Sequence, residues 1–282
     1  MSTFEAVVVE SVVETPDTRT LVLDVGSRAS YHAGQYVTID PHQFAGLRGF
    51  VAHLEHLKGR REAPRAYSMS SAPHDLHLAV TIKEEVYEAG QTKYPPLLSG
   101  FLVHHLRAGD PVVVRGFVGT YTLPDEVAAR TEHVLHLCAG SGSVPNLSIL
   151  RDSLRRHIRL RHTFVYSSRT WQEIIFRDAL EGIREQYSAR LRVIHSLTRE
   201  PTPLSYGGDV QAGRIGLDLL RPLLSPEPIS LVYVCGPAVT VWQRRACAPQ
   251  GITPAPRFIE TMLGHLEALN VPRARIKIES YG

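Results

Sequence analysis

The stretch Gly140-Ser141-Gly142-Ser143-Val144-Pro145 decides the fold of the second half of the chain. An apolar run over residues 134–139 precedes it, and a segment with helical spacing over residues 145–159 follows it. Glycines let the backbone turn tightly beside a pyrophosphate, and the free N–H groups at a helix start favour an anion. Pro145 is tolerated in a first helical turn, but it stands where the Rossmann fingerprint has glycine. The stretch therefore predicts either a nucleotide site or a purely structural strand-to-helix turn.

Around this stretch, apolar strand candidates alternate with helix candidates. The strands are expected at residues 133–139, 162–167, 191–197, 230–235 and 275–279. The helices are expected at residues 145–159, 172–187, 217–224, 239–247 and 255–269. This alternation is typical of βαβ units with a parallel sheet and right-handed crossovers. We place the boundary of this α/β domain at Pro124-Asp125-Glu126, so that it covers residues 126–282.

Residues 1–125 have a different pattern, with short strand-like runs separated by clusters of Gly, Pro, Asp and His. The runs lie at residues 4–13, 18–25, 35–39, 66–70, 76–83 and 111–117. Several short strands without long helices predict a small antiparallel Greek-key β-barrel. Residues 43–61 interrupt this pattern of short strands. They contain apolar side chains three and four residues apart, which predict an inserted amphipathic helix: Leu47, Phe50, Val51, Leu54 and Leu57.

The composition excludes several classes of protein. A chain of 282 residues is long enough for two domains, and its 43% hydrophobic content is that of a folded globular protein. A net charge of +3 is too small to indicate that the protein binds nucleic acid. No apolar run reaches the roughly 18–20 residues that span a bilayer, and no secretion signal is visible, so a cytoplasmic location is expected. Cys138, Cys235 and Cys247 lack the spacing of a metal site or disulfide framework.

A second candidate site is Arg65-Ala66-Tyr67-Ser68 in the first half. Arginine makes bidentate contacts to a diphosphate, tyrosine packs on an aromatic ring, and a serine hydroxyl hydrogen-bonds a ring nitrogen. An extended segment with these groups suits a flavin nucleotide. Two nucleotide sites in one chain indicate an enzyme that moves electrons between them.

Two further motifs follow strands of the second half. Tyr166-Ser167-Ser168-Arg169 offers a guanidinium and two hydroxyls to a 2′-phosphate, whereas NAD-specific sites usually place a carboxylate there. The alternative is a helix N-cap at Thr170 beside a solvated arginine. Cys235-Gly236-Pro237 leaves room for a flat ring at a strand end, but for this motif taken alone a buried structural cysteine is the simpler explanation.

The remaining candidates carry weaker signals. Ser99 stands before Leu102 at an expected helix start, a geometry that accepts an anion. Tyr121 is either an aromatic contact near the domain junction or part of the ordinary core. Histidines occur as close pairs without a third ligand and are expected to be surface or packing residues, namely His53 and His56, His104 and His105, and His133 and His136.

Taken together, these motifs resemble the ferredoxin–NADP reductase superfamily over essentially the whole chain. The order Arg-x-Tyr-Ser, Gly-x-Gly-x-x-Pro, Tyr-x-x-Arg, Cys-Gly-Pro and Glu279-Ser280-Tyr281 is specific as a set. Residues 138–154 and 174–183 resemble reductase components of aromatic acyl-CoA oxygenases. The insert before Arg65 and the ending at residues 276–282 are similar to the type that serves benzoyl-CoA 2,3-epoxidation. The sequence departs from the family at Pro96, where glycine is expected, and contains no cysteine-rich ferredoxin segment.

The resemblance implies an FAD-binding β-barrel followed by an NADP-binding α/β domain. Arg65 would contact the FAD diphosphate, and Tyr67 and Ser68 would line the isoalloxazine, with Ser68 near its N5. The NADP pyrophosphate would lie on Gly140, Ser141, Gly142, Ser143, Val144 and Pro145, and its 2′-phosphate on Ser167, Ser168 and Arg169. The nicotinamide would lie by Cys235 and Glu279, and Tyr281 would lie close to the other flavin face. The expected cofactor contacts also include Ala66, Lys83, Leu98, Ser99, Tyr121, Arg214, Gly236 and Pro237.

The expected activity follows from the same resemblance. A hydride would pass from NADPH to FAD, and single electrons would then leave to an iron–sulfur ferredoxin or a di-iron oxygenase on a separate chain. Ser68 and Cys235 would shape the ring stack, and Tyr281 would gate the nicotinamide. No metal, nucleic acid or membrane is expected to bind. Two alternatives remain: a flavin reductase or diaphorase with a small-molecule acceptor, and a non-enzymatic redox sensor that merely binds a nucleotide.

Overall fold

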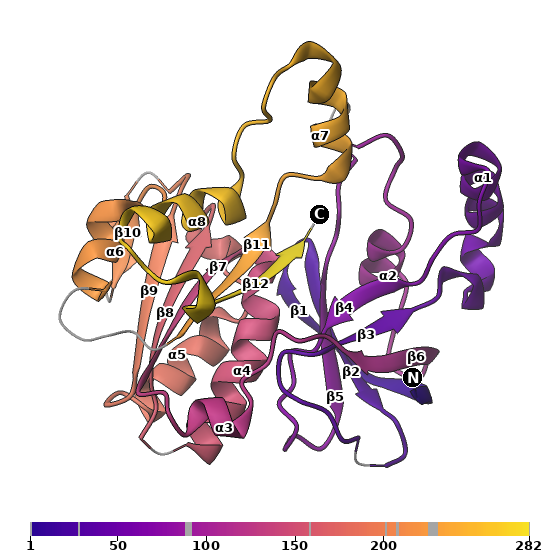
Figure 1. Ribbon diagram of the computed structural model, residues 1–282. Coiled ribbons are helices and arrows are strands. Elements are labelled where there is room, and N and C mark those ends of the chain that lie inside the picture. Colours follow the sequence, from indigo (N-terminus) through magenta and orange to yellow (C-terminus); the bar gives the residue numbers. More distant parts are fainter. Residues whose placement is uncertain are drawn as a thin grey trace. The chain divides into compact units, whose positions relative to one another are not determined.

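The computed structural model describes residues 2–27, 29–87, 92–157, 159–200, 202–206, 209–224 and 231–281. The chain divides into two compact units, Met1–Thr122 and Leu123–Gly282. The first unit is built on an antiparallel sheet and the second on a parallel one (Figure 1). The fold class predicted from the sequence is therefore confirmed.

Antiparallel pairing joins the six strands of the first unit in the order β4-β3-β6-β1-β2-β5. They are β1 (Ser2–Thr15), β2 (Thr18–Asp24), β3 (Tyr36–Ile39), β4 (Arg65–Ser68), β5 (Leu78–Lys83) and β6 (Pro111–Val118). An isolated bridge between Met69 and Val80 links the two outer strands and closes the sheet into a barrel. The interior is filled by buried aliphatic side chains such as Val8, Leu21 and Val114, because valine and leucine alternate with polar residues along these strands.

The predicted insert lies between β3 and β4. It consists of two 3₁₀ turns, η1 (Pro41–Gln43) and η2 (Ala45–Leu47), and helix α1 (Arg48–Lys58), which ends at Gly59 in the left-handed conformation. Val51 and Leu54 are buried against the barrel, but Leu57, which shares their spacing, is 51% exposed. Lys58, four residues after Leu54, takes the inward position, and its side chain is only 12% exposed. One further helix, α2 (Ser99–His104), packs beside β5.

All the paired strands of the second unit are parallel, in the order β10-β9-β8-β7-β11-β12. They are β7 (His133–Ala139), β8 (Arg161–Ser168), β9 (Leu191–Leu197), β10 (Val210–Ala212), β11 (Leu231–Pro237) and β12 (Ile276–Tyr281). Nearly every residue of β7 and β11 is buried, as expected for strands covered on both faces. The short β10 was not predicted from the sequence.

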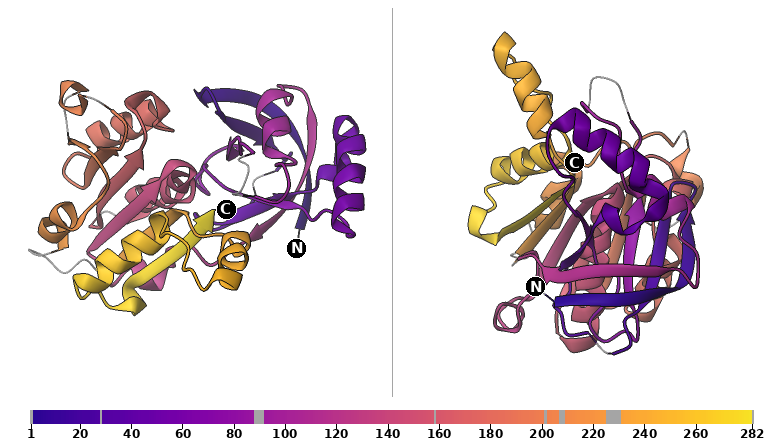
Figure 2. Two further views of the ribbon diagram at one scale, coloured as in Figure 1. Left: turned by 90° about the horizontal axis from the view of Figure 1, so that it is seen from above. Right: turned by 90° about the vertical axis from the view of Figure 1, so that its right-hand side faces the viewer.

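Helices cover both faces of this parallel sheet (Figure 2). Helices α4 (Ser143–Arg156) and α5 (Arg177–Gln186) pack on one face, and α6 (Leu217–Leu224) and α8 (Phe258–Ala268) on the other. The remaining helices are α3 (Asp125–Ala128) and α7 (Val241–Cys247). The helix predicted over residues 172–187 is split, because Phe176 adopts a positive φ of 63° between a 3₁₀ turn and α5. Within the described ranges, no helix is both long and apolar enough to cross a bilayer.

Candidate nucleotide-binding sites

The glycine stretch forms a tight turn at the carboxyl end of the central strand β7. Gly140–Gly142 make one 3₁₀ turn, Gly140 has a positive φ of 53°, and α4 begins at Ser143. The carbonyl of Gly140 accepts a hydrogen bond from the Tyr166 hydroxyl at 3.0 Å. The Ser143 hydroxyl lies 3.0 Å from the same carbonyl and 3.1 Å from the Tyr166 oxygen. Hydroxyl groups from two elements therefore hold the turn, while the helix start provides N–H groups that no helical carbonyl accepts.

Two positions at this turn require glycine because neighbouring atoms leave no room for a Cβ. A Cβ on Gly142 would lie 2.1 Å from the carbonyl oxygen of Cys235. A Cβ on Gly236 would lie 2.7 Å from Cδ1 of Phe258. Gly142 thus lies against the backbone at the end of β11, and Gly236 lies against the Phe258 ring of α8.

The strand order brings the separate motifs to one edge of the sheet. The chain runs outward from β7 through β8 and β9, then returns to the other side of β7 as β11. In such sheets ligands bind outside the carboxyl ends at the point where the order reverses. The register pairs Cys138 with Cys235, Cys235 with Glu279, and Pro237 with Tyr281. The glycine turn, Cys235-Gly236-Pro237 and Glu279-Ser280-Tyr281 accordingly lie side by side.

Cys235 is buried and electrically neutral. Burial raises the pKa of its thiol well above the ordinary value, the charge of Glu279 and the neighbouring Cys138 add to this, and a hydrogen bond with Tyr281 opposes it. A thiol of raised pKa is a poor nucleophile. Burial and the raised pKa therefore make the Cys235 thiol unsuited to covalent chemistry.

The predicted 2′-phosphate residues Ser167, Ser168 and Arg169 lie at the carboxyl end of β8, with the two serines as its last residues. The Ser167 side chain is half-buried, whereas that of Ser168 is buried. Arg169 is 46% exposed and forms an ion pair with Glu173, with Nη2 and Oε1 2.6 Å apart. Thr170 stands at the N-cap of the 3₁₀ turn Trp171–Glu173, but its side chain makes no capping bond there. The sequence therefore identified Arg169 as a surface cation and Glu173 as the nearest carboxylate, but it did not predict the ion pair between them.

An aromatic pair next to this segment was also missed. The rings of Trp171 and Tyr206 stack with centroids 4.7 Å apart and planes 3° apart. The Glu200 carboxylate joins them, accepting from the Trp171 backbone N–H at 2.9 Å and from the Tyr206 hydroxyl at 3.0 Å. Arg214 follows β10 at the same carboxyl edge of the parallel sheet and is exposed. The spacing of residues 171 and 206 carries no signal, because only the parallel sheet brings their loops together.

A buried hydrogen-bond chain supports the glycine turn from within the domain. Asn146 Nδ2 donates to the Gly142 carbonyl at 2.8 Å, and its Oδ1 lies 2.8 Å from His136 Nδ1. His136 Nε2 lies 3.0 Å from His162 Nδ1, and His162 Nε2 lies 3.0 Å from the Ser153 hydroxyl. His136 was expected only as a surface or packing residue. The structure makes it part of a continuous polar chain in the core.

In the first unit, Arg65, Ala66, Tyr67 and Ser68 form β4, paired with β3 so that Ile39 lies opposite Arg65 and Tyr36 opposite Ser68. Arg65 and Tyr67 are half-buried, Ala66 is exposed and Ser68 is buried. Burial raises the pKa of Tyr67, as does the charge of Glu85, while Arg65 lowers it. Tyr67 thus remains a neutral phenol at physiological pH.

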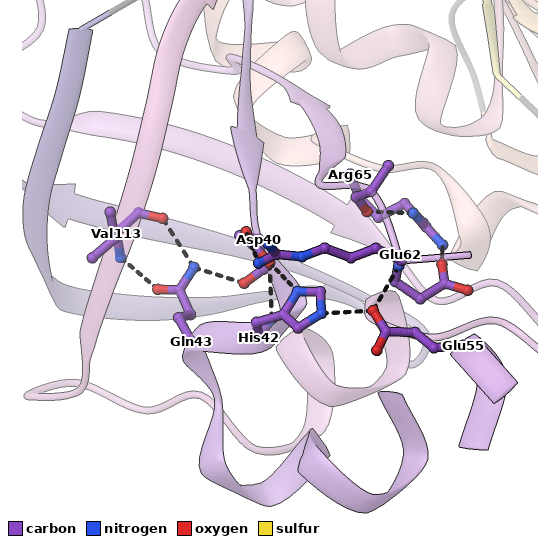
Figure 3. Close-up of polar contacts among 9 residues, drawn as sticks. Asp40, His42, Gln43, Glu55, Glu62, Arg65 and Val113 are labelled. Atoms are coloured by element: carbon purple, nitrogen blue, oxygen red, sulfur yellow. Dashed lines mark hydrogen bonds and ion pairs between the residues drawn. The ribbon is translucent and has the colours of Figure 1, made fainter. Parts of the chain in front are cut away.

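Arg65 is held by a neighbouring carboxylate. Its Nη2 lies 2.6 Å from Oε2 of Glu62, and its Nη1 donates to the Ala63 carbonyl at 2.5 Å. Figure 3 shows Glu62 pointing toward Arg65, with Asp40, His42 and Glu55 beside them. Hydrogen bonds to Asp40 and Glu55 raise the pKa of His42. This network lies within the insert, and sequence reasoning did not foresee it.

The other residues expected to contact FAD have defined surroundings. Lys83 forms an ion pair with Asp17, with Nζ 2.6 Å from Oδ2. Leu98 is buried in the core. Ser99 starts α2 as predicted, and its hydroxyl accepts from the Glu85 backbone N–H at 3.0 Å. Tyr121 is buried. These side chains are therefore fixed by the protein's own contacts.

Comparison with known proteins supports an oxidoreductase. A family model described as the oxidoreductase NAD-binding domain matches residues 137–241. The chain is 27% identical over 222 residues to a component of the 1,2-phenylacetyl-CoA epoxidase of Escherichia coli K12, covering 77% of the chain and 56% of that protein. It is 30% identical over 241 residues to the ferredoxin reductase component of 3-ketosteroid-9-alpha-monooxygenase of Mycolicibacterium smegmatis, covering 83% and 58%. The chain thus spans less than two thirds of these relatives.

A solved structure shares the two-domain fold. The flavohem-like FAD/NAD-binding domain of nitric oxide dioxygenase from Vibrio cholerae O1 biovar El Tor superposes with a TM-score of 0.69 at 22% identity, covering 99% of this chain and 98% of that one. A β-barrel followed by a doubly wound sheet with its glycine turn at the switch point defines the class of two-domain nucleotide-binding oxidoreductases. In sequence the chain is similar to ferredoxin reductase components of oxygenase systems, and in fold it is similar to the ferredoxin–NADP+ reductase of Plasmodium falciparum.

Proposed function

We propose that the protein is an NADPH-dependent flavoprotein reductase that passes electrons to an iron–sulfur ferredoxin or a di-iron oxygenase component. The single observation that carries this proposal is the gathering of Gly140–Gly142, Cys235–Pro237 and Glu279–Tyr281 at one sheet edge. When bound, FAD and NADPH supply hydride transfer and single-electron release. The protein binds and orients them and excludes water.

The residues of this chain fit both cofactors. Gly142 has no room for a side chain. Without a side chain at this position, the backbone of the turn can lie close to a pyrophosphate. The 14-residue helix α4 directs its first N–H groups toward the same place. Cys235 offers a neutral thiol to the nicotinamide, with Glu279 and Tyr281 on the adjacent strand. In the first unit, Arg65 offers a partly exposed guanidinium to the FAD diphosphate, and Tyr67 and Ser68 would line the flavin ring.

The names of the relatives suggest the partner and pathway. One is a component of a phenylacetyl-CoA epoxidase and the other a ferredoxin reductase component of a monooxygenase, so both belong to oxygenase systems by name. We propose the same kind of role here, with an aromatic acyl-CoA as the substrate of the partner oxygenase.

The test is reduction of the bound flavin. The full chain is reconstituted with FAD, passed through gel filtration and mixed with NADPH without oxygen. We expect the yellow colour to stay with the protein and to bleach on mixing, and an added oxidised ferredoxin to be reduced in turn. Colourless protein that oxidises no NADPH would remove the proposal. Flavin lost on the column would point to a diffusible-flavin reductase, and binding without turnover to a sensor.

Coenzyme choice is predicted to depend on Arg169 and its partner Glu173. Arg169→Ala should lower kcat/KM for NADPH about tenfold and leave that for NADH within about twofold, because a charge-assisted bond to the 2′-phosphate is lost. Glu173→Gln should raise the preference for NADPH, because it releases the guanidinium from a carboxylate 2.6 Å away. Steady-state kinetics with both coenzymes measure these ratios.

The matched control is Arg192→Ala. Arg192 is also paired with a carboxylate, with Nε 2.8 Å from Oδ2 of Asp209, but it lies at the amino end of β9. Its loss should leave the NADPH-to-NADH ratio unchanged. Equal losses for both coenzymes in Arg169→Ala would exclude the assigned contact with the 2′-phosphate.

A further inference from the structure

The insert between β3 and β4 folds back on itself to reach the start of β4. Glu55 of α1 links its two ends, because Oε1 accepts from His42 Nε2 at 2.9 Å and from the Glu62 backbone N–H at 2.8 Å. His42 Nδ1 in turn lies 2.6 Å from Oδ1 of Asp40, directly after β3. Glu62 therefore has a fixed backbone although it lies outside any helix or strand (Figure 3).

The Glu62 carboxylate is buried between two cations. Its side chain is 4% exposed, with Oε1 2.5 Å from Nζ of Lys58 and Oε2 2.6 Å from Nη2 of Arg65. Burial raises the pKa of Glu62, but the bonds from Lys58 and Arg65 outweigh it and hold the pKa below the usual value. Glu62 is thus a charged group at neutral pH, and it compensates both cations.

Arg65 keeps donors for a ligand in this arrangement. A guanidinium carries five N–H donors, and within the described residues Glu62 and Ala63 are the acceptors that engage it. The side chain is 37% exposed. A guanidinium already fixed on one side loses little conformational freedom when an anion binds on the other.

Two roles for Glu62 differ in their consequences. A carboxylate that merely occupied Arg65 would have to leave when an anionic ligand arrives. Glu62 is poorly suited to leave, because its backbone is bonded to Glu55 and its departure would strand Lys58 without its carboxylate partner. The geometry favours a carboxylate that stays and orients the guanidinium.

We propose that Glu62 is a positioning residue that aims Arg65 at the diphosphate of FAD, and that the insert over residues 40–64 is the part of the fold that fixes Glu62. This inference rests on the proposed function, since it requires FAD to bind at β4. It assigns a binding role to a segment that otherwise only adds a helix to the barrel.

The test compares two flavins that differ in the group Arg65 would contact. FAD carries the diphosphate and riboflavin carries none, so titration of the full chain with each, followed by flavin fluorescence, separates the two contributions. Glu62→Gln should raise the Kd for FAD about tenfold, the loss expected when an outer carboxylate no longer orients a binding group. The Kd for riboflavin should stay within about twofold, since the ring pocket is unaltered. Glu10→Gln, which removes the same charge from an exposed position on β1, should change neither.

A double-mutant comparison tests whether Glu62 acts through Arg65. Arg65→Ala should weaken FAD binding at least as much as Glu62→Gln, and adding Glu62→Gln to Arg65→Ala should cause no further loss. Unchanged or tighter FAD binding in Glu62→Gln would overturn the inference and favour simple occupation. An equal rise in the Kd for riboflavin in Glu62→Gln would also overturn the inference, because it would indicate a general packing defect in the flavin site. If the wild-type protein bound riboflavin and FAD with the same Kd, this inference would be wrong but the proposed function would stand. If the protein bound neither flavin, the proposed function would be wrong as well.

Discussion

Gly142→Ala is expected to destabilise the second unit severely and to abolish NADPH binding. The new Cβ would lie 2.1 Å from the carbonyl oxygen of Cys235 and 2.8 Å from the backbone nitrogen of Gly236. Both neighbours are backbone atoms of a buried strand end, so neither can rotate away. We expect a loss of about 3 kcal/mol or more, as for other overpacked core sites, and a fall of about 6–12 °C in the melting temperature of a unit of this size.

Gly182→Ala provides the matched control. Gly182 lies in α5, and no heavy atom lies within 4 Å of an added Cβ. Alanine favours a helix over glycine by about 1 kcal/mol, so this variant should be as stable as the wild type or more so. Differential scanning calorimetry and NADPH titration measure both effects. A Gly142→Ala protein with wild-type melting and NADPH affinity would show that the turn does not pack as described.

The architecture was predictable because its signals are local. Continuous apolar runs followed by helical spacing mark parallel strands, and short alternating runs with turn residues mark the barrel. Two details of the helices were not predictable from these local signals. Phe176 with its positive φ splits one expected helix, and Lys58 replaces Leu57 on the inner face of α1.

The contacts around the candidate sites were not predictable, because they depend on register and on folded loops. His136 meets His162 only because β7 and β8 pair in parallel with one offset. Glu62 lies only three residues before Arg65, but outside a helix this spacing predicts no ion pair, and the bond that fixes the Glu62 backbone comes from Glu55 of α1. Sequence motifs identified Gly142 and Arg65, whereas the residues that hold them in place carry no motif.

The second large effect expected is a loss of stability in mild acid caused by the buried histidines of the second unit. The pKa of His136 is lowered to about 4, chiefly by burial; the hydrogen bond with Asn146 opposes this effect and the nearby His133 adds to it. Burial also lowers the pKa of His162 well below its ordinary value. In the unfolded chain both would titrate near pH 6.5. The unfolded state therefore binds more protons below that pH, and acid favours unfolding.

The difference between the pKa of His136 in the folded and in the unfolded chain sets how far the free energy of unfolding falls and over which pH range. For His136 alone, the free energy of unfolding should be constant above about pH 6.5 and fall by about 3 kcal/mol as the pH drops to about 4. Urea denaturation at several pH values measures it. The two tryptophans of the chain, Trp171 and Trp242, both lie in the second unit, so their fluorescence reports on that unit.

A variant separates the histidine from carboxylates that titrate in the same range. His136→Gln keeps a donor for Asn146 and an acceptor for His162 but cannot gain a proton, so its stability should fall less steeply with acid. His53→Gln, on the exposed side of α1, should leave the tryptophan signal's pH dependence unchanged. Equal acid sensitivity in His136→Gln and wild type would contradict the prediction.

The hydrogen-bond chain explains why protonation is disruptive beyond its desolvation cost. Asn146 donates to Gly142 and therefore presents its oxygen to His136, which must carry its hydrogen on Nδ1 and accept on Nε2. A protonated His136 would point a second N–H at Nδ1 of His162, so that His162 would have to move its own hydrogen to Nε2 and reverse its bond with Ser153. Because the same chain ends on the Gly142 carbonyl, acid should loosen the turn, and NADPH affinity should fall over the same pH range in which stability falls.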